Sequence, residues 1–426
     1  MKRANVVITF DSHTPYLAYR VRELQGALER RGLLGRVRMR VILLGAKESS
    51  YDWDEGDLAR EYGGVPVTVL TDAFHGLGIR AYLSGAAART CWKLAWELVR
   101  TRPKLVFVGG YDRPASLMAA LLGIGFRWKT GPMHDSRFND AESFAKRIFL
   151  EAMKAPFMRL YPFFMCSGRE CVEYTRFLAG VKRPAYYAGW NVVDNASIAA
   201  NADDGGRDVE LLEAFGLEWG ESFFFMPIRF LPKKNIFRVI AAYGNCVEDL
   251  VKAGEKPVPL VIAGKGPLRE EALERIRERG LEKLIRVVDW VPYELVPRAC
   301  RLSSAVILAS THDQWGLIVN EALSAGAPVL VSNRCGAHEL VRNYENGFTF
   351  DPYDVVHLGE LMLELSTGEE LVVMLRSDAR VSMDRFSIDQ FLEAWFAVFQ
   401  RYDLIGGEGE ASDSLATGAL RESVDV

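Results

Sequence analysis

Residues 311–332 have the sequence THDQWGLIVNEALSAGAPVLVS, and this stretch decides the expected fold. An apolar, β-branched run, Ala305 to Ser310, precedes it and predicts a buried parallel strand. Gly316 then marks a turn, and Leu317 to Ala325 are expected to form a helix that ends before a Gly and a Pro. Residues 328–332 predict a second buried strand. Strand, loop, helix and strand in succession are the repeating unit of a parallel α/β sheet.

The start of this predicted helix has the properties of a phosphate site. The first turn of a helix presents N–H groups without partners and a partial positive charge. Asp313 precedes the turn and Glu321 follows eight positions later, so both carboxylates are expected to face one crevice beyond the strand ends. This arrangement predicts a ligand with both phosphate and hydroxyl groups. In the alternative, Asp313 caps the helix and Glu321 is a solvated helix residue.

The same stretch resembles the donor-site signature of family 4 retaining glycosyltransferases, commonly E-x-F-G-L-x-x-x-E-A. Here the residues are D-Q-W-G-L-I-V-N-E-A, with Asp313 in place of the first Glu and Trp315 in place of Phe. The resemblance implies that Glu321 binds the nucleotide ribose and that Asp313, one methylene shorter than Glu, approaches the transferred sugar. It also implies that the distal phosphate and sugar meet the backbone of Gly316, Leu317 and Ile318.

Further donor contacts follow from the resemblance. Relatives carry an Arg after the first strand of the second domain and a Lys five residues later, and Arg229 and Lys234 hold these positions. Fixed cations there would stabilise the charge of a departing diphosphate; the alternative is a solvated basic turn. Gly264 and Gly266 would let backbone approach the nucleotide closely. Val291 is the expected contact of the base.

Two histidines are the candidates for the acceptor side. His13 lies in the turn after an apolar run at residues 4–10, and His134 ends a later run. The resemblance implies that His134 lies beside the acceptor hydroxyl and the transferred sugar. An imidazole there could hydrogen-bond the reacting centre or handle a proton. The alternatives are a polar turn residue for His13 and a local bond from His134 to Asp135.

Strands alternate with helices along most of the chain, which predicts doubly wound parallel sheets. The resemblance implies the GT-B fold, in which two Rossmann-like domains face a cleft. The expected domains are an acceptor-binding domain at residues 1–205 and a nucleotide-sugar-binding domain at residues 206–385, with a linker at residues 203–208. A helix at residues 386–404 is expected to cross back to the first domain, before a disordered tail at residues 405–426.

Two segments of the first half combine aromatic and basic residues. Residues 86–100 predict a helix with Trp92 and Trp96 on one face, where we expect them to pack in the core. Residues 145–164 form a basic amphipathic segment, which suits an anionic membrane surface. The alternative for this segment is a helix pair with ordinary snorkelling bases.

Composition limits the classes of function. The chain has 426 residues and a net charge of −4, which argues against a general nucleic-acid binder. Residues 1–200 hold 29 Lys+Arg and 19 Asp+Glu, a net of +10, so this half suits an anionic acceptor or membrane surface. Six scattered Cys and the lack of an apolar leader predict a cytoplasmic protein, with contact to the inner face of the membrane as a further option.

The resemblance implies a metal-independent, retaining hexosyltransferase with no cofactor. It would move a sugar from a UDP-sugar or GDP-sugar to a hydroxyl of a saccharide or lipid-linked acceptor. The pathway expected for it is cell-surface polysaccharide or glycolipid synthesis. Two other classes stay open: a nucleotide-sugar epimerase of the same architecture, and a catalytically idle nucleotide-binding scaffold.

Overall fold

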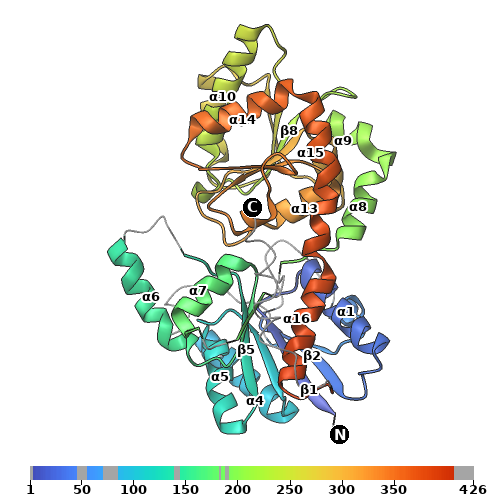
Figure 1. Ribbon diagram of the computed structural model, residues 1–426, viewed down its shortest axis with the longest axis vertical. Coiled ribbons are helices and arrows are strands. Elements are labelled where there is room, and N and C mark those ends of the chain that lie inside the picture. The colour runs from blue at the N-terminus through green and yellow to red at the C-terminus, as the bar shows by residue number, and fades with distance from the viewer. Residues whose placement is uncertain are drawn as a thin grey trace. The chain divides into compact units, whose positions relative to one another are not determined.

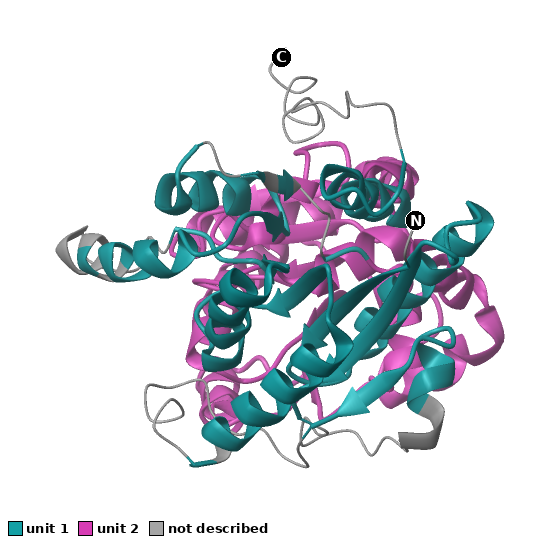
Figure 2. Ribbon diagram, turned by 90° about the horizontal axis from the view of Figure 1, so that it is seen from below, with its two compact units in different colours: residues 1–138, 142–192, 388–426 teal, residues 139–141, 193–387 magenta. Residues whose placement is uncertain are grey.

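The computed structural model describes residues 3–45, 55–70, 85–138, 144–181, 184–187 and 191–406. The chain divides into two compact units (Figure 2). The first unit comprises residues 1–138, 142–192 and 388–426, and the second comprises residues 139–141 and 193–387. Most of the predicted C-terminal tail, from residue 407 onward, lies outside the described residues.

The first unit is built on a parallel sheet, which has seven strands in the described residues, in the order β3-β2-β1-β4-β5-β6-β7 (Figure 1). Successive residues of a strand point to opposite faces, and both faces of this sheet are buried. Val6 and Ile8 therefore join one apolar core, while Val7 joins another on the opposite face. The strands are β1 Ala4–Phe10, β2 Val37–Leu43, β3 Val67–Val69, β4 Leu105–Gly109, β5 Lys129–His134, β6 Phe164–Cys166 and β7 Ala185–Tyr187.

Helices cover both faces of this sheet. One core packs α1 and α16 against the sheet, and the other packs α4, α5 and α7 against it. The helices of this unit are α1 Pro15–Arg30, α2 Glu55–Glu61, α4 Gly85–Thr101, α5 Pro114–Phe126, α6 Phe144–Met158, α7 Arg169–Ala179 and α16 Ile388–Arg401. The predicted crossover helix is confirmed, because α16 packs in the core of the first unit although it follows the second unit in sequence.

The second unit has a parallel sheet of six strands, all within the described residues, in the order β10-β9-β8-β11-β12-β13. Its strands are β8 Phe224–Pro227, β9 Leu260–Ala263, β10 Ile285–Val288, β11 Ala305–Leu308, β12 Val329–Ser332 and β13 Gly347–Phe350. Its α-helices are α8 Asn195–Asp203, α9 Asp208–Ala214, α10 Ile236–Ala253, α11 Arg269–Glu278, α12 Val296–Leu302, α13 Leu317–Ala325, α14 Val355–Thr367 and α15 Glu369–Ser382. Short 3-10 turns complete it: η1 Gly205–Arg207, η2 Pro232–Lys234, η3 Tyr293–Leu295, η4 Gly336–Leu340 and η5 Met383–Phe386.

The helix predicted at Leu317 to Ala325 is confirmed, since α13 spans Leu317–Ala325 between β11 and β12. The boundary between the units differs from the expected one. The second unit begins at Val193 rather than at residue 206, because α8 packs against α12 and α13 and buries Ile198 and Ala202 there. Residues 203–208, predicted as a linker, lie inside the second unit as the end of α8, a 3-10 turn and the start of α9.

The prediction that Trp92 and Trp96 pack in the core is wrong. Their side chains on α4 are 73% and 65% exposed, respectively. Leu94 and Leu98 of the same helix are fully buried against the sheet instead. The i, i+4 spacing of the two Trp residues correctly indicates one helix face, but that face points to solvent.

His13 packs between the first strand and α2. Its Nε2 lies 3.0 Å from Glu61 Oε2, and its Nδ1 lies 3.2 Å from the Tyr62 hydroxyl. Burial lowers the pKa of His13 to about 4, so the ring is uncharged at neutral pH. In the neutral tautomer with its proton on Nε2, Nδ1 can accept from the tyrosine hydroxyl.

Replacing Trp395 with Ala tests whether α16 stabilises the first unit. The indole is 1% exposed and stacks on Phe107 with a centroid distance of 4.0 Å. Its removal leaves a cavity in the core, so we expect a loss of about 3–5 kcal/mol in the unfolding free energy of the first unit. Hydrogen exchange of amides in β1 and β4 measures this loss. Trp219→Ala is the matched control, because Trp219 is 68% exposed; equal losses in the two variants would contradict the role of α16.

Replacing His13 with Gln tests the uncharged state of the buried ring. The pKa of His13 is about 4 in the folded chain and 6.5 without burial, so the unfolded chain takes up the proton first. The parent therefore loses stability as pH falls from 6.5 toward 4, and His13→Gln should lose less. We expect a difference of about 1 kcal/mol in urea unfolding between about pH 7 and about pH 5, after allowance for screening. His357→Gln, in α14, should follow the parent; a parent-like His13→Gln curve would show that the ring is not buried uncharged.

Candidate functional site

The strand order of the second sheet places two loops side by side. The order changes direction between β8 and β11, and parallel sheets bind ligands beyond the carboxyl ends of strands at such a point. The loop after β8 carries η2, and the loop after β11 leads into α13. Backbone joins them, because the N–H of Thr311 donates to the carbonyl of Lys233 over 2.8 Å.

An ion pair connects the same two loops. Lys234 Nζ lies 2.6 Å from Asp313 Oδ2, and Lys233 Nζ lies 3.7 Å from Asp313 Oδ1. The Ser310 hydroxyl also lies within 3.4 Å of Asp313 Oδ2. Burial alone would raise the pKa of the Asp313 carboxyl, but the charges of Lys234 and Lys233 outweigh it, and this pKa lies below its ordinary value. At neutral pH the site therefore holds a fixed carboxylate between two ammonium groups.

The start of α13 offers backbone donors close to this ion pair. Gly316 caps the helix in a left-handed conformation, with φ of 110°, and a Cβ there would strike Leu308. Glycine is therefore required by both the backbone conformation and the lack of space. Within the part of the chain that the structure describes, the N–H groups of Leu317 and Ile318 donate to no other residue. These donors, on a helix start beside two lysines, suit a phosphate group.

Glu321 lies on the second turn of α13, and the residue is only 6% exposed. Its charge lies near the buried Cys300, where burial first and this carboxylate second raise the pKa of the thiol well above its ordinary value. Trp315, which stands where relatives often have Phe, donates from Nε1 to Asn320 Oδ1 over 2.8 Å. This bond ties the loop before α13 to the residue next to Glu321.

Gly264 and Gly266 serve a close approach of two backbones. A Cβ at Gly264 would strike the carbonyl of Ile228, and one at Gly266 would lie 2.7 Å from backbone atoms of Phe230. The loop after β9 thus packs against the extension of β8, where Phe230 N–H donates to the Lys265 carbonyl over 2.9 Å. The glycines are explained by this packing, whereas the predicted approach of a nucleotide stays a prediction. Val291, the predicted base contact, follows β10 and is 7% exposed.

Arg229 and Lys234, predicted as a pair of diphosphate contacts, differ in their surroundings. Lys234 is bound to Asp313, as described above, with its side chain 18% exposed. Arg229 is exposed, and its guanidinium has no partner within the described residues. The two cations therefore follow the same strand, but only Lys234 is held in place by a carboxylate.

The two histidines of the first unit lie at the carboxyl ends of its strands, but both rings are buried. His13 is 4% exposed and contacts Glu61 and Tyr62. His134 is also 4% exposed, and its Nε2 lies 3.1 Å from the hydroxyl of Thr175. Both rings are thus engaged with side chains of their own unit.

His134 also belongs to a cluster with potential metal ligands. The ligand atoms of His134, Cys166 and Cys171 lie within 4.8 Å of one another, and all three residues are buried. Burial raises the pKa of the Cys171 thiol well above its ordinary value, which keeps it protonated. Metal coordination requires a thiolate, so a metal ion bound here would have to displace the proton of this thiol.

Several contacts of the candidate site were missed from the sequence. Lys233 stands beside the predicted Lys234, and Ser310 ends the predicted strand, yet neither was singled out. The i, i+4 spacing of Cys171 and Thr175 on α7 was the available signal for the partners of His134. No sequence signal connects His13 with Tyr62, because the contact spans 49 residues.

Comparisons with known proteins agree with this geometry. Residues 210–382 match the profile of the family described as glycosyl transferases group 1, which is less than half of the chain. Alpha-D-kanosaminyltransferase of Streptomyces kanamyceticus is 24% identical over 171 residues, 40% of this chain and 43% of that protein. O-antigen chain mannosyltransferase B of Escherichia coli is 31% identical over 125 residues, 29% of this chain and 31% of that protein. The matched stretch thus spans less than half the length of either relative.

Among solved structures, Anabaena HepE in complex with UDP and glucose superposes with a TM-score of 0.68 at 16% identity. The superposition covers 94% of this chain and 100% of that chain, so the likeness in fold extends over both units. It confirms the GT-B fold that the sequence predicts. Residues 210–382 are therefore a domain of the glycosyl transferases group 1 family, carried by a chain with the GT-B fold.

Proposed function

We propose that this chain is a glycosyltransferase that takes its sugar from a nucleoside diphosphate sugar. The observation that carries the proposal is the ion pair of Lys234 with Asp313 beside the start of α13. It places a half-buried carboxylate, two lysines and free backbone N–H groups at the carboxyl ends of β8 and β11. Cations and N–H groups suit a diphosphate, and carboxylates suit the hydroxyls of ribose and sugar.

The donor would lie across the loops after β8 and β11. The N–H groups of Leu317 and Ile318 would donate to the distal phosphate, and Glu321 would accept from the ribose. Arg229 and Lys234 would stabilise the negative charge that builds on the diphosphate as it leaves. The UDP bound to Anabaena HepE makes a UDP-sugar the first donor to test on this chain, followed by a GDP-sugar.

Asp313 has two roles in this proposal. Its carboxylate lies 2.6 Å from Lys234 Nζ, so it holds the ammonium group in one position. It also lies in the loop that leads into the helix start, where the sugar would lie next to the distal phosphate. We propose a retaining transfer, in which the acceptor hydroxyl attacks from the face that the diphosphate leaves. The lysines, the arginine and the helix start would supply the positive charge, so that no metal ion is required.

The acceptor would be a saccharide or a lipid-linked saccharide of a cell-surface polysaccharide or glycolipid. The matched relative named O-antigen chain mannosyltransferase B supports this class of acceptor. On the acceptor side we retain His134, at the carboxyl end of β5. The ring of His13 is engaged by Glu61 and Tyr62, and we propose that it supports its loop.

We also retain a cytoplasmic location as part of the proposal. Within the described residues, none of the helices is long and apolar enough to cross a membrane.

Nucleotide binding with and without Glu321 tests the donor site. UDP, GDP and ADP are titrated by calorimetry into the parent and into Glu321→Ala. We expect one nucleotide to bind the parent, and the variant to bind it about 10- to 100-fold more weakly, because a charge-assisted bond to the ribose is lost. Glu360→Ala, on the exposed face of α14, is the matched control and should bind like the parent. If no nucleotide binds the parent, or if Glu321→Ala binds as well as the parent, the donor site is not at α13.

Turnover of the bound donor tests the reaction. We expect the parent to release UDP from a UDP-sugar slowly with water as acceptor, and to do so equally well in EDTA. Asp313→Asn should bind UDP within a few-fold of the parent. It should cleave the UDP-sugar roughly 100-fold more slowly, because Lys234 loses the charge that positions it. Asp313→Glu, which restores the residue of the family signature, is the matched control for charge.

The products separate the alternatives. An epimerised donor without release of UDP would identify an epimerase, and a bound but unchanged donor would identify an idle scaffold. Either outcome contradicts the proposed transfer, even if the nucleotide binds as expected.

A further inference from the structure

Basic residues gather along the amino edge of the first sheet. The strands of this sheet are parallel, so their amino ends meet at one edge, opposite the carboxyl edge that carries His13 and His134. The bases precede or open β1, β2, β4 and β5, and the stretches 3–5, 36–40, 100–104 and 127–129 contain no acid. Within the described residues they are Arg3, Arg36, Arg38, Arg40, Arg100, Arg102, Lys104, Arg127 and Lys129.

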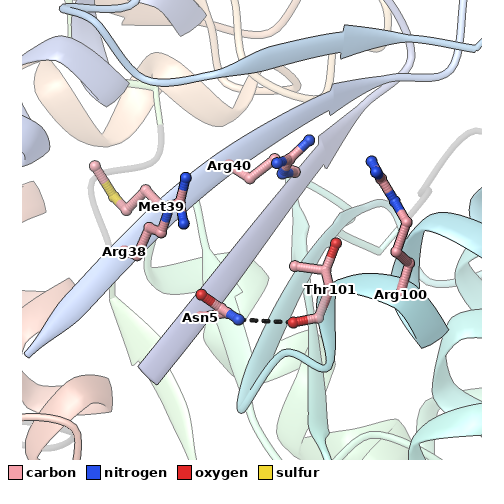
Figure 3. A pocket seen from close by; sticks show the side chains of 6 residues that line it. All are labelled: Asn5, Arg38, Met39, Arg40, Arg100 and Thr101. Atoms are coloured by element: carbon pink, nitrogen blue, oxygen red, sulfur yellow. Dashed lines mark hydrogen bonds between the residues drawn. The ribbon is translucent and has the colours of Figure 1, made fainter. Parts of the chain in front are cut away.

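Three of these arginines line a cavity of about 210 Å³. Arg38 and Arg40 come from β2, and Arg100 comes from the last turn of α4 (Figure 3). In β2 the alternate residues Arg38, Arg40 and Ile42 share one face, and they pass from exposed through half-buried to buried. The face is covered by α4 at its inner part and emerges beyond the end of that helix, where the cavity lies.

The polar groups of the cavity leave a positive charge in it. Asn5 Nδ2 donates to the carbonyl of Thr101 over 2.7 Å, which occupies this carbonyl at the end of α4 (Figure 3). Arg40 contacts the hydroxyl of Thr68 at 3.4 Å. Among the described residues, Glu97 is the one carboxylate that pairs with the three arginines, 2.8 Å from Arg100. Three guanidinium groups and one carboxylate give the cavity a net charge that suits a phosphate.

An apolar face of α4 runs directly into this cavity. Trp92, Trp96 and Arg100 follow one another at i, i+4 and i+8, so they share one face of the helix. The two indoles are 73% and 65% exposed, and Val99 beside them is 38% exposed. Two large aromatic side chains exposed side by side are unusual on a protein surface, and such apolar patches mark sites of contact.

The neighbouring helix ends in the same way. α5 packs beside α4 (Figure 1) and carries no charged residue from Pro114 to Phe126. Its Leu121, Ile124 and Phe126 are 56%, 68% and 57% exposed. Arg127 and Lys129 follow at once and are exposed. Two adjacent helices thus end with exposed apolar side chains followed by bases at the same edge of the sheet.

We propose that this surface docks the first unit on a membrane that contains anionic phospholipids. Trp side chains favour the boundary between acyl chains and headgroups, and bases beside them favour negatively charged headgroups. The phosphate of one headgroup enters the cavity of Arg38, Arg40 and Arg100, while Trp92 and Trp96 enter the bilayer surface. A protein partner would account for the apolar stripes, but less well for an edge where nine bases face a single paired carboxylate, that of Glu97. The proposal does not depend on the proposed transfer reaction.

Binding of the full chain to vesicles tests the proposal. Co-sedimentation is measured with vesicles of phosphatidylcholine alone and with vesicles in which roughly a third is phosphatidylglycerol. We expect binding to the anionic vesicles, with a blue shift of tryptophan fluorescence. The triple variant Arg38→Ser, Arg40→Ser, Arg100→Ser should bind them on the order of 100-fold more weakly, since each base near such a surface contributes. Trp92→Ser with Trp96→Ser should bind at least about tenfold more weakly and lose most of the blue shift.

A matched control separates this surface from general charge. Arg275→Ser, Arg277→Ser, Arg342→Ser removes the same three charges from exposed positions of the second unit and should bind like the parent. Circular dichroism and thermal melting verify that each variant is folded.

Four results would overturn the proposal. The first is a parent that binds both kinds of vesicle equally, and the second is a first-unit triple variant that binds like the parent. The third is an affinity of the chain for soluble glycerol 3-phosphate equal to its affinity for the vesicles. This result would identify a free phosphate as the ligand. The fourth is a dimer in sedimentation that Trp92→Ser with Trp96→Ser abolishes, which identifies a second copy of the chain as the occupant of α4.

Discussion

Parallel pairing of the strands is the constraint on which the other features of this molecule depend. In both sheets every strand pair among the described residues is parallel. Each connection must therefore return through a helix or loop to the starting edge. The carboxyl ends of the strands meet at one edge and the amino ends at the other. Short polar loops at the carboxyl edge of the second sheet thus bring Lys234 within 2.6 Å of Asp313, although 79 residues separate them.

The ion pair of Lys234 and Asp313 also gives a physical reason for Asp in place of the family's Glu. A Glu side chain is one methylene longer, and with the same backbone it would place its carboxylate beyond the present contact with Lys234. The backbone of Asp313 is fixed on both sides, because its N–H donates to the Arg334 carbonyl and its carbonyl accepts from Gly336 N–H. The shorter side chain is therefore matched to a lysine that comes close to this loop.

The sequence predicted the elements of the second unit well because local signals agree there. The bounds of α13 follow from Gly316 and Gly326, which both adopt left-handed conformations at the ends of the helix. Local signals failed where a distant segment decides the outcome. The need for Gly at position 264 comes from Ile228, and the burial of His13 comes from Tyr62. Neither contact has a period or a spacing that a sequence pattern can reveal.

The error at Trp92 and Trp96 has a different physical origin. Helical periodicity indicates which residues share a face. It does not indicate whether that face packs on protein or is exposed. α4 has two apolar stripes, one with Leu94 and Leu98 against the sheet and one with the tryptophans outside. A helix that is apolar on both sides is predicted as buried, although one side of α4 is exposed. The exposed stripe ends at Arg100, which is itself exposed and pairs with Glu97 of the same helix.

The two edges of the first sheet therefore face different chemical demands. The carboxyl edge holds two histidines whose rings are buried among neighbouring side chains, and parallel sheets generally bind ligands beyond this edge. The amino edge holds bases, most of which are exposed. The positive net charge of residues 1–200 is thus concentrated at an edge where an anionic surface can approach without obstructing the opposite one. The basic residues of the first half of the sequence precede or open the strands of the first sheet. Because parallel strands all begin at the same edge, these bases lie together at its amino edge.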